Sequence, residues 1–90
     1  MTDPKDALGH INFGTCLHAL ERRAEALAEF TRALEIDTSQ TQAWVGLIAC
    51  LAESGRRDEA LATLDQAEEA LPGDLELIRV RNILTAAPGS

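Results

Sequence analysis

The chain has 90 residues and a formal net charge of −7 at pH 7, with 46% hydrophobic but only 3% aromatic residues. This length predicts one domain, close to the lower limit for burying a sufficient core. The acidic charge argues against a nucleic-acid partner and against an anionic membrane surface, because both need a basic face. The many alanines and leucines favour closely packed helices over a sheet.

Location is predicted from two further features. The longest apolar stretch runs only from Ala43 to Ala52 and is too short to span a bilayer. The first residues lack a basic segment followed by an apolar one, so no secretory signal is expected. A cytoplasmic location follows as the expectation.

The first two helices are predicted over residues 4–20 and 22–36. Asp3 is placed to cap the first, with Pro4 at its first position. The second has apolar residues at helical spacing and is interrupted by residues 37–39.

The third and fourth helices are predicted over residues 41–53 and 57–70. Ser54-Gly55 ends the third, and residues 71–73 end the fourth. Asp74 is placed to cap a fifth helix, from Leu75 to about Ala86. Since all connections are short, successive helices are expected to lie antiparallel in an all-α fold.

The sequence also repeats itself at a fixed spacing of about 34 residues, which is typical of stacked supersecondary units. Residues of the same kind recur at this spacing: Cys16 and Cys50, Leu17 and Leu51, Ala26 and Ala60, Phe30 and Leu64, Ala33 and Ala67. The small residues are expected where helix backbones approach, and bulky side chains, Phe13 and Trp44 among them, are expected to fill the adjoining core.

This pattern resembles the tetratricopeptide repeat, W-x2-L-G-x2-Y followed by A-x3-F, A and P. The matching residues are His10, Phe13, Gly14, Leu17, Ala26, Phe30, Ala33 and Thr38, then Trp44, Leu47, Ile48, Leu51, Ala60, Leu64, Ala67 and Pro72. The resemblance implies a single domain over residues 1–90: a right-handed α-solenoid of two helix hairpins, 7–40 and 41–74, closed by a capping helix, 75–86. It also implies a module that binds a protein or peptide.

Some positions depart from the family pattern. His10 replaces the large aromatic residue, Ile48 the small residue and Thr38 the proline. The family's carboxylate clamp, which needs lysine and asparagine on the inner face, is not matched, because Ile11, Thr15 and Gly46 stand there. The resemblance therefore names no ligand.

Helical spacing places an inner stripe on the first, third and fifth helices. It is predicted to form a groove for an amphipathic or extended segment. The predicted groove residues are Leu8, Ile11, Thr15, His18, Gln42, Val45, Ala49, Arg79 and Ile83. Ala52 also falls on this stripe, and Glu53 and Glu76 are expected at its rim. The alternative is that these are ordinary apolar residues partly covered by their neighbours.

The sequence gives no support for catalysis, cofactor binding or metal binding. His18 follows Cys16 by two positions, which do not face each other on a helix. Neither a close set of metal ligands nor a glycine-rich phosphate loop is present. No enzymatic activity is expected, and Glu21, Glu25 and Glu29 are interpreted as part of a solvated charged face.

A structural role through self-association is the second hypothesis. Gly9, Asn12, Cys16 and Leu20 form an uncapped N-terminal face on which two copies could join as a homodimer. The C-terminal face is expected to be polar, through Arg81, Asn82 and Thr85. Cys16 and Cys50 are expected to stay unpaired, with Cys50 buried and Cys16 accessible.

Overall fold

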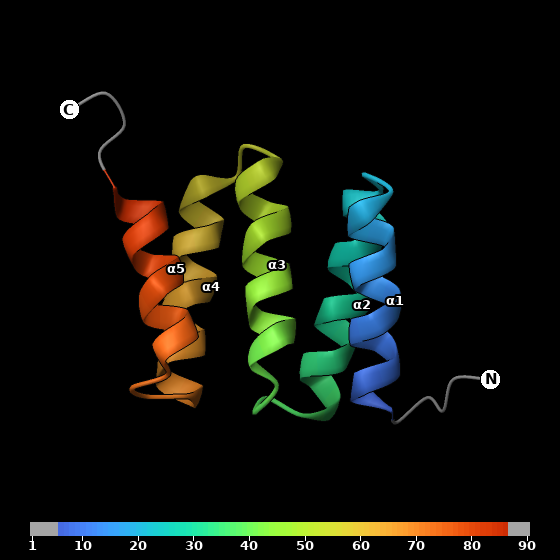
Figure 1. The fold of residues 1–90 in the computed structure, drawn as a ribbon, viewed down its shortest axis with the longest axis horizontal. Coiled ribbons are helices and arrows are strands. Elements are labelled where there is room, and N and C mark those ends of the chain that lie inside the picture. Colours follow the sequence, from blue (N-terminus) through green and yellow to red (C-terminus); the bar gives the residue numbers. More distant parts are fainter. Residues whose placement is uncertain (1–5, 87–90) are drawn as a thin grey trace.

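A stack of helices makes up the described part of the protein. In the computed structural model, residues 6–86 are described, and within them there are five helices and no strand. The helices are α1 (Ala7–Ala19), α2 (Arg23–Ile36), α3 (Thr41–Glu53), α4 (Arg57–Ala70) and α5 (Leu75–Thr85). They stand side by side, with α1 and α5 at opposite ends of the row (Figure 1). The all-helical prediction is confirmed.

The predicted helix bounds agree closely with the structure. α3 and α4 begin and end where the sequence predicted, α2 begins one residue later, and α5 ends at Thr85. α1 begins at Ala7, later than predicted, because Asp6 before it is extended. The predicted cap at Asp3 and the first helical position at Pro4 lie outside the described residues. Asp74 caps α5 as predicted, since its Oδ1 accepts backbone hydrogen bonds from Glu76 at 2.9 Å and Leu77 at 3.3 Å.

Two helical layers follow from the packing. Each helix contacts the next one along the chain, and α3 also contacts both α1 and α5. Since α1, α3 and α5 touch in turn, they form one continuous layer, and α2 and α4 lie behind it (Figure 1). This layer carries the predicted inner stripe.

The turns that follow α1 and α3 lie one repeat apart and have the same geometry. The amide of Arg22 donates to the carbonyl of Leu17 at 2.9 Å, and the amide of Arg56 donates to Leu51 at 2.9 Å. Both turns require a positive φ, which Gly55 adopts at 79° and Glu21 at 61°. A residue with a Cβ is strained there, so Glu21 stands where glycine fits better.

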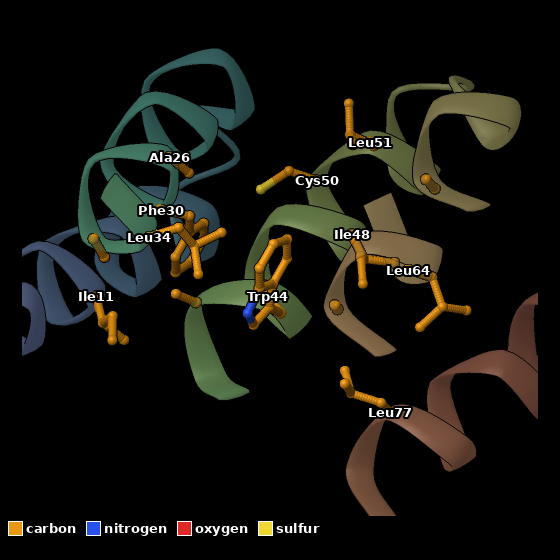
Figure 2. Close-up of a cluster of buried hydrophobic side chains, with 14 of the residues drawn as sticks. Ile11, Ala26, Phe30, Leu34, Trp44, Ile48, Cys50, Leu51, Leu64 and Leu77 are labelled. Atoms are coloured by element: carbon orange, nitrogen blue, oxygen red, sulfur yellow. The ribbon is translucent and has the colours of Figure 1, made fainter. Parts of the chain in front are cut away.

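Large side chains from α2, α3, α4 and α5 meet in the core (Figure 2). Trp44 is buried, as predicted, and its Nε1 donates to the carbonyl of Thr38 at 2.8 Å. Ile48, Leu64 and Leu77 are fully buried next to it along the stack.

The prediction that Phe13 fills the core is wrong, because its side chain is 54% exposed. α3 contacts α2 as well as α4, and its equivalent residue Leu47 packs on the core. No described helix lies against the corresponding face of α1. Exposure at this position therefore depends on which neighbour the helix has, not on its own sequence.

Glu29 corrects a second expectation. The sequence predicts that Glu29 lies on a solvated face, but the residue is only 7% exposed. Its Oε1 lies 2.7 Å from Nδ1 of His10, and Arg32 Nη1 donates to its Oε2 at 2.6 Å. His10 occupies the position where the family has a large aromatic residue, so the imidazole and the carboxylate together fill this part of the α1–α2 contact.

The prediction of a polar C-terminal face is correct for only part of that face. Arg81 turns back to α4, where it binds Glu68 and Asp65, each at 2.6 Å. Asn82 and Thr85 are exposed as expected. Leu75 and Ile78 are exposed as well, so this end of the stack is apolar near the start of α5.

Candidate functional site

A cleft lies between α3 and α5 in the inner layer. It has a volume of about 290 Å³. Its lining is apolar except at one end, and consists of Val45, Ile48, Ala49, Ala52 and Glu53 from α3 and Val80, Ile83 and Leu84 from α5.

Helical spacing explains why these side chains converge. Residues three or four apart on a helix share a face, so Val45, Ala49 and Ala52 form one strip along α3. Val80 and Leu84 form the facing strip of α5. The fully buried Ile48 forms the floor, while Ile83 is 68% exposed and forms an apolar rim. Small side chains at Ala49 and Ala52 leave the space between the helices open.

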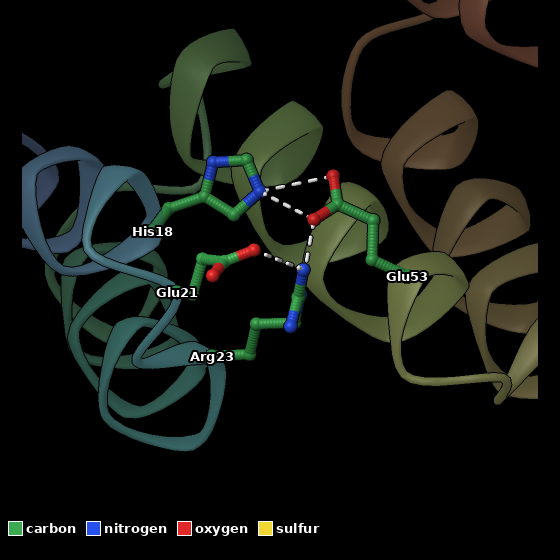
Figure 3. Close-up of polar contacts among 4 residues, drawn as sticks. All are labelled: His18, Glu21, Arg23 and Glu53. Carbon is green, nitrogen blue, oxygen red and sulfur yellow. Dashed lines mark hydrogen bonds and ion pairs between the residues drawn. The ribbon is translucent and has the colours of Figure 1, made fainter.

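A polar cluster borders the cleft at Glu53. The Nε2 atom of His18 lies 3.0 Å from both carboxylate oxygens of Glu53, and Arg23 Nε donates to Oε1 at 3.1 Å. Glu21 contributes a looser ion pair with Arg23, at 3.6 Å. Figure 3 shows His18 and Arg23 converging on the Glu53 carboxylate from the α1 and α2 side.

The charge of Glu53 is stabilised by these contacts. Its pKa is lowered below the ordinary value, first by the hydrogen bond from Arg23 and further by His18, while burial acts in the opposite direction. Glu53 is therefore ionised at neutral pH. Because its partners come from both α1 and α2, these contacts link the end of α3 to the first helix pair.

Three of the predicted groove residues meet in the cleft: Val45, Ala49 and Ile83. His18 lies next to it through Glu53. Leu8, Thr15, Gln42 and Arg79 are exposed but do not line it. Arg79 pairs with Glu76 at 3.5 Å, and the Thr15 hydroxyl donates to the carbonyl of Ile11.

The assignment of Ile11 to the groove is wrong. Ile11 is 4% exposed and belongs to the hydrophobic core. α1 packs against both α2 and α3, so its apolar face is covered where that of α3 remains open towards α5. The groove is therefore shorter than predicted.

The sequence placed Ala52 on the inner stripe and Glu53 at its rim, and both line the cleft. Three lining residues were not predicted: Ile48, Val80 and Leu84. The spacing of Val80 and Leu84 on α5 was a usable signal, since the two share one helical face with the strip on α3 opposite. Ile48 gave no such signal, because its position in the repeat is that of a hairpin-core residue.

The described residues form neither a metal site nor a membrane-spanning helix. Within residues 6–86, no group of three or more His, Cys, Asp or Glu side chains is arranged to hold a metal ion. No described helix is long and apolar enough to cross a membrane.

The stacked helices and the matching turns after α1 and α3 define a helical-repeat protein. A family model described as tetratricopeptide repeat matches residues 17–84. The chain belongs to the tetratricopeptide repeat family. Repeats of this family are non-catalytic and generally mediate protein–protein interactions. No curated protein matches the chain in sequence.

Proposed function

We propose that the chain binds a segment of another protein in the cleft between α3 and α5. The observation that carries this proposal is the apolar lining of a concave space on the layer formed by α1, α3 and α5. Grooves between helices bind partner segments by taking up their apolar side chains. A buried apolar floor at Ile48 and an exposed apolar rim at Ile83 suit that mode.

The volume of the cleft and the net charge of the chain indicate what kind of segment binds. A volume of about 290 Å³ is at the lower end of ligand-pocket sizes, so the cleft accepts one or two apolar side chains of a segment that continues outside it. The protein carries a net charge of −7, which favours a partner with lysine or arginine beside the apolar anchor. The expected ligand is therefore a basic segment with one or two large apolar residues.

A display library of random peptides provides a test that needs no known partner. Peptides are selected on the immobilised full chain and then measured by fluorescence anisotropy. Selected sequences are expected to share an apolar anchor with basic neighbours, and to bind less tightly as salt rises.

Two variants on the same helix then locate the site. Ile83→Glu places a charge in the cleft rim, and is expected to weaken peptide binding at least tenfold because the anchor would have to desolvate it. Leu75→Glu introduces the same charge on α5 at a residue that is 81% exposed and outside the cleft, and is expected to have little effect. Equal binding by both variants would place the peptide site elsewhere.

We also propose the repeat assignment, with repeats at 7–40 and 41–74 and α5 closing a right-handed stack. It is supported by the matching turns after α1 and α3, where Glu21 and Gly55 occupy equivalent positions and both adopt a positive φ.

Self-association is a second candidate function. It is favoured by the exposure of Phe13 on α1 and of Leu20, the C-cap residue of that helix, at the end of the stack opposite to α5. Large apolar side chains that remain uncovered together mark an interaction surface. Sedimentation equilibrium distinguishes the two candidates, because a peptide-binding module can remain a monomer while a self-associating one cannot.

A further inference from the structure

One face of α1, continued by the C-cap residue Leu20, carries uncharged residues at the spacing of a coiled-coil seam. Gly9, Phe13, Cys16 and Leu20 follow one another at intervals of four, three and four positions. We name these four residues the α1 stripe. Phe13 is 54% exposed, Leu20 is 66% exposed, and Cys16 is exposed between them.

The protein's own repeat shows what such a face packs against. The residues that follow Gly9, Phe13 and Cys16 by one repeat are Ala43, Leu47 and Cys50 in α3. Ala43 and Cys50 are fully buried, and Leu47 packs on the core, because α2 lies against α3. The α1 stripe is therefore the counterpart of a face that, one repeat later, is covered by a helix.

The charge distribution favours a second copy of the chain as the partner of the α1 stripe. α1 contains no Asp, Glu, Lys or Arg. The whole chain has a net charge of −7, so most approaches between two copies are repulsive. An uncharged helix is a surface on which a second copy can dock without bringing carboxylates together, and it offers a charged partner no complementary group.

The sizes of the stripe side chains favour an antiparallel orientation of the two α1 helices. In an antiparallel pair of α1 helices related by a two-fold axis between residues 14 and 15, Gly9 opposes the partner's Leu20, and Phe13 opposes the partner's Cys16. Each large side chain then meets a small one, as in well-packed helix interfaces. A parallel pair would set Phe13 against the partner's Phe13 and leave a void between the two glycines.

We propose that two copies of this chain pair through antiparallel α1 stripes about a two-fold axis. This inference rests on the second proposed function, self-association, and specifies its interface and register. One pair of short helices buries less than the roughly 1,200–2,000 Å² of standard stable interfaces, so the dimer is weak and reversible. Association is expected within a range of about 10 μM to 1 mM, and added salt strengthens it by screening the like charges.

Sedimentation equilibrium over that concentration range tests the dimer. Phe13→Glu is expected to weaken association at least tenfold, because it places a charge in each half of the interface. The matched variant Leu75→Glu adds the same charge at the other end of the stack and is expected to associate as the unmodified chain does. Circular dichroism checks that both variants keep their helices. Equal effects of the two variants would overturn the proposal.

Cross-linking with a bismaleimide that has a two-carbon bridge tests the register. In the antiparallel pair the two Cys16 positions are offset by only about 4.5 Å along the helix axes, so Cys16 is expected to cross-link. The variant Cys16→Ser/Leu20→Cys moves the thiols about 16 Å apart along the axes and is expected to lose the cross-link. In a parallel pair, both would cross-link.

The possible failures are distinguishable. A dimer by mass without a Cys16 cross-link overturns the α1 interface and leaves self-association standing. Species that grow beyond the dimer indicate a head-to-tail contact between α1 and the exposed start of α5, which also overturns the two-fold pair. A monomer at all concentrations and salt levels overturns both self-association and this interface.

Discussion

The ring of Phe30 lies directly against the backbone of Gly46, across the contact between α2 and α3. A Cβ atom added at Gly46 would lie 2.6 Å from Cε2 of this ring, closer than real side chains approach. The same ring also lies close to Gly14 of α1, where an added Cβ would lie 3.0 Å from Cε1. Phe30 thus packs closely against glycines of two helices, one on α1 and one on α3.

Gly46→Ala is therefore expected to destabilise the protein even though alanine favours a helix. The gain in helix propensity is about 1 kcal/mol, whereas overpacking a filled core costs about 1–3 kcal/mol. The cost of the clash is expected to exceed the gain in helix propensity, because the ring is buried and packs closely against both glycines. Urea denaturation measures the difference. Adding Phe30→Leu to Gly46→Ala should recover part of the lost stability, and strictly additive effects would show that the ring and the glycine do not constrain each other.

Glu21→Gly is expected to stabilise the protein by about 1 kcal/mol. Glu21 has a φ of 61°, a left-handed conformation that costs a residue with a Cβ roughly 1–2 kcal/mol. Its exposed side chain makes only a loose ion pair with Arg23, so little is lost on removal. The melting temperature of Glu21→Gly should rise, and that of Gly55→Ala, at the equivalent turn, should fall. A lower melting temperature for Glu21→Gly would contradict this account.

The buried contact between His10 and Glu29 is expected to couple their contributions to stability. His10→Ala would leave Oε1 of a buried carboxylate without its 2.7 Å partner, at a cost of about 1–3 kcal/mol. Glu29→Ala removes the same interaction from the other side, so the double variant should lose less than the sum of the two single losses. A double-mutant cycle in urea measures this, and a coupling near zero would indicate that the contact contributes nothing.

Trp44→Ala is expected to cost about 3–5 kcal/mol, because it removes a large buried ring from the contact between successive helix pairs. Trp44→Phe keeps much of the apolar volume and loses the hydrogen bond to Thr38, so its cost should be closer to about 1 kcal/mol. Denaturation midpoints that do not separate the two variants would show that the ring is not an anchor of the core.

Acidification is expected to weaken the start of α5 through Asp74. Its pKa is lowered from its ordinary value of 3.8, first by the hydrogen bond from the Thr41 hydroxyl and then by the backbone amides of Leu77 and Glu76. A lowered pKa in the folded state means that the stabilisation is complete above the ordinary value and is lost as pH falls through the folded one. Between about pH 5 and 2 the melting temperature should therefore fall less in Asp74→Asn, which keeps a capping side chain but cannot titrate, than in the unmodified chain.

Glu69→Gln, which removes an exposed carboxylate of α4, is the control for this comparison. It should follow the unmodified chain over the same pH range. If Asp74→Asn and Glu69→Gln respond to acid alike, the cap at α5 is not the group that titrates.

Local sequence was sufficient to predict the helices and their relation to one another. The bounds of α3 and α4 followed from apolar spacing and from the turn residues after them, because helix ends depend on interactions within a few positions. The regular repeat spacing predicted which positions are equivalent, and the burial of Trp44 and Cys50 followed from it. These properties recur along the chain and are encoded within each unit.

Only the tertiary structure decided which of the equivalent faces are covered. Ile11 and Val45 occupy the same position in their repeats, yet Ile11 is in the core and Val45 lines the cleft. Phe13 is exposed where Leu47 is packed, and Glu29 is buried against His10. A helical pattern shows which side chains share a face, but exposure depends on the neighbour that the face meets, and that neighbour differs between the middle of a stack and its ends.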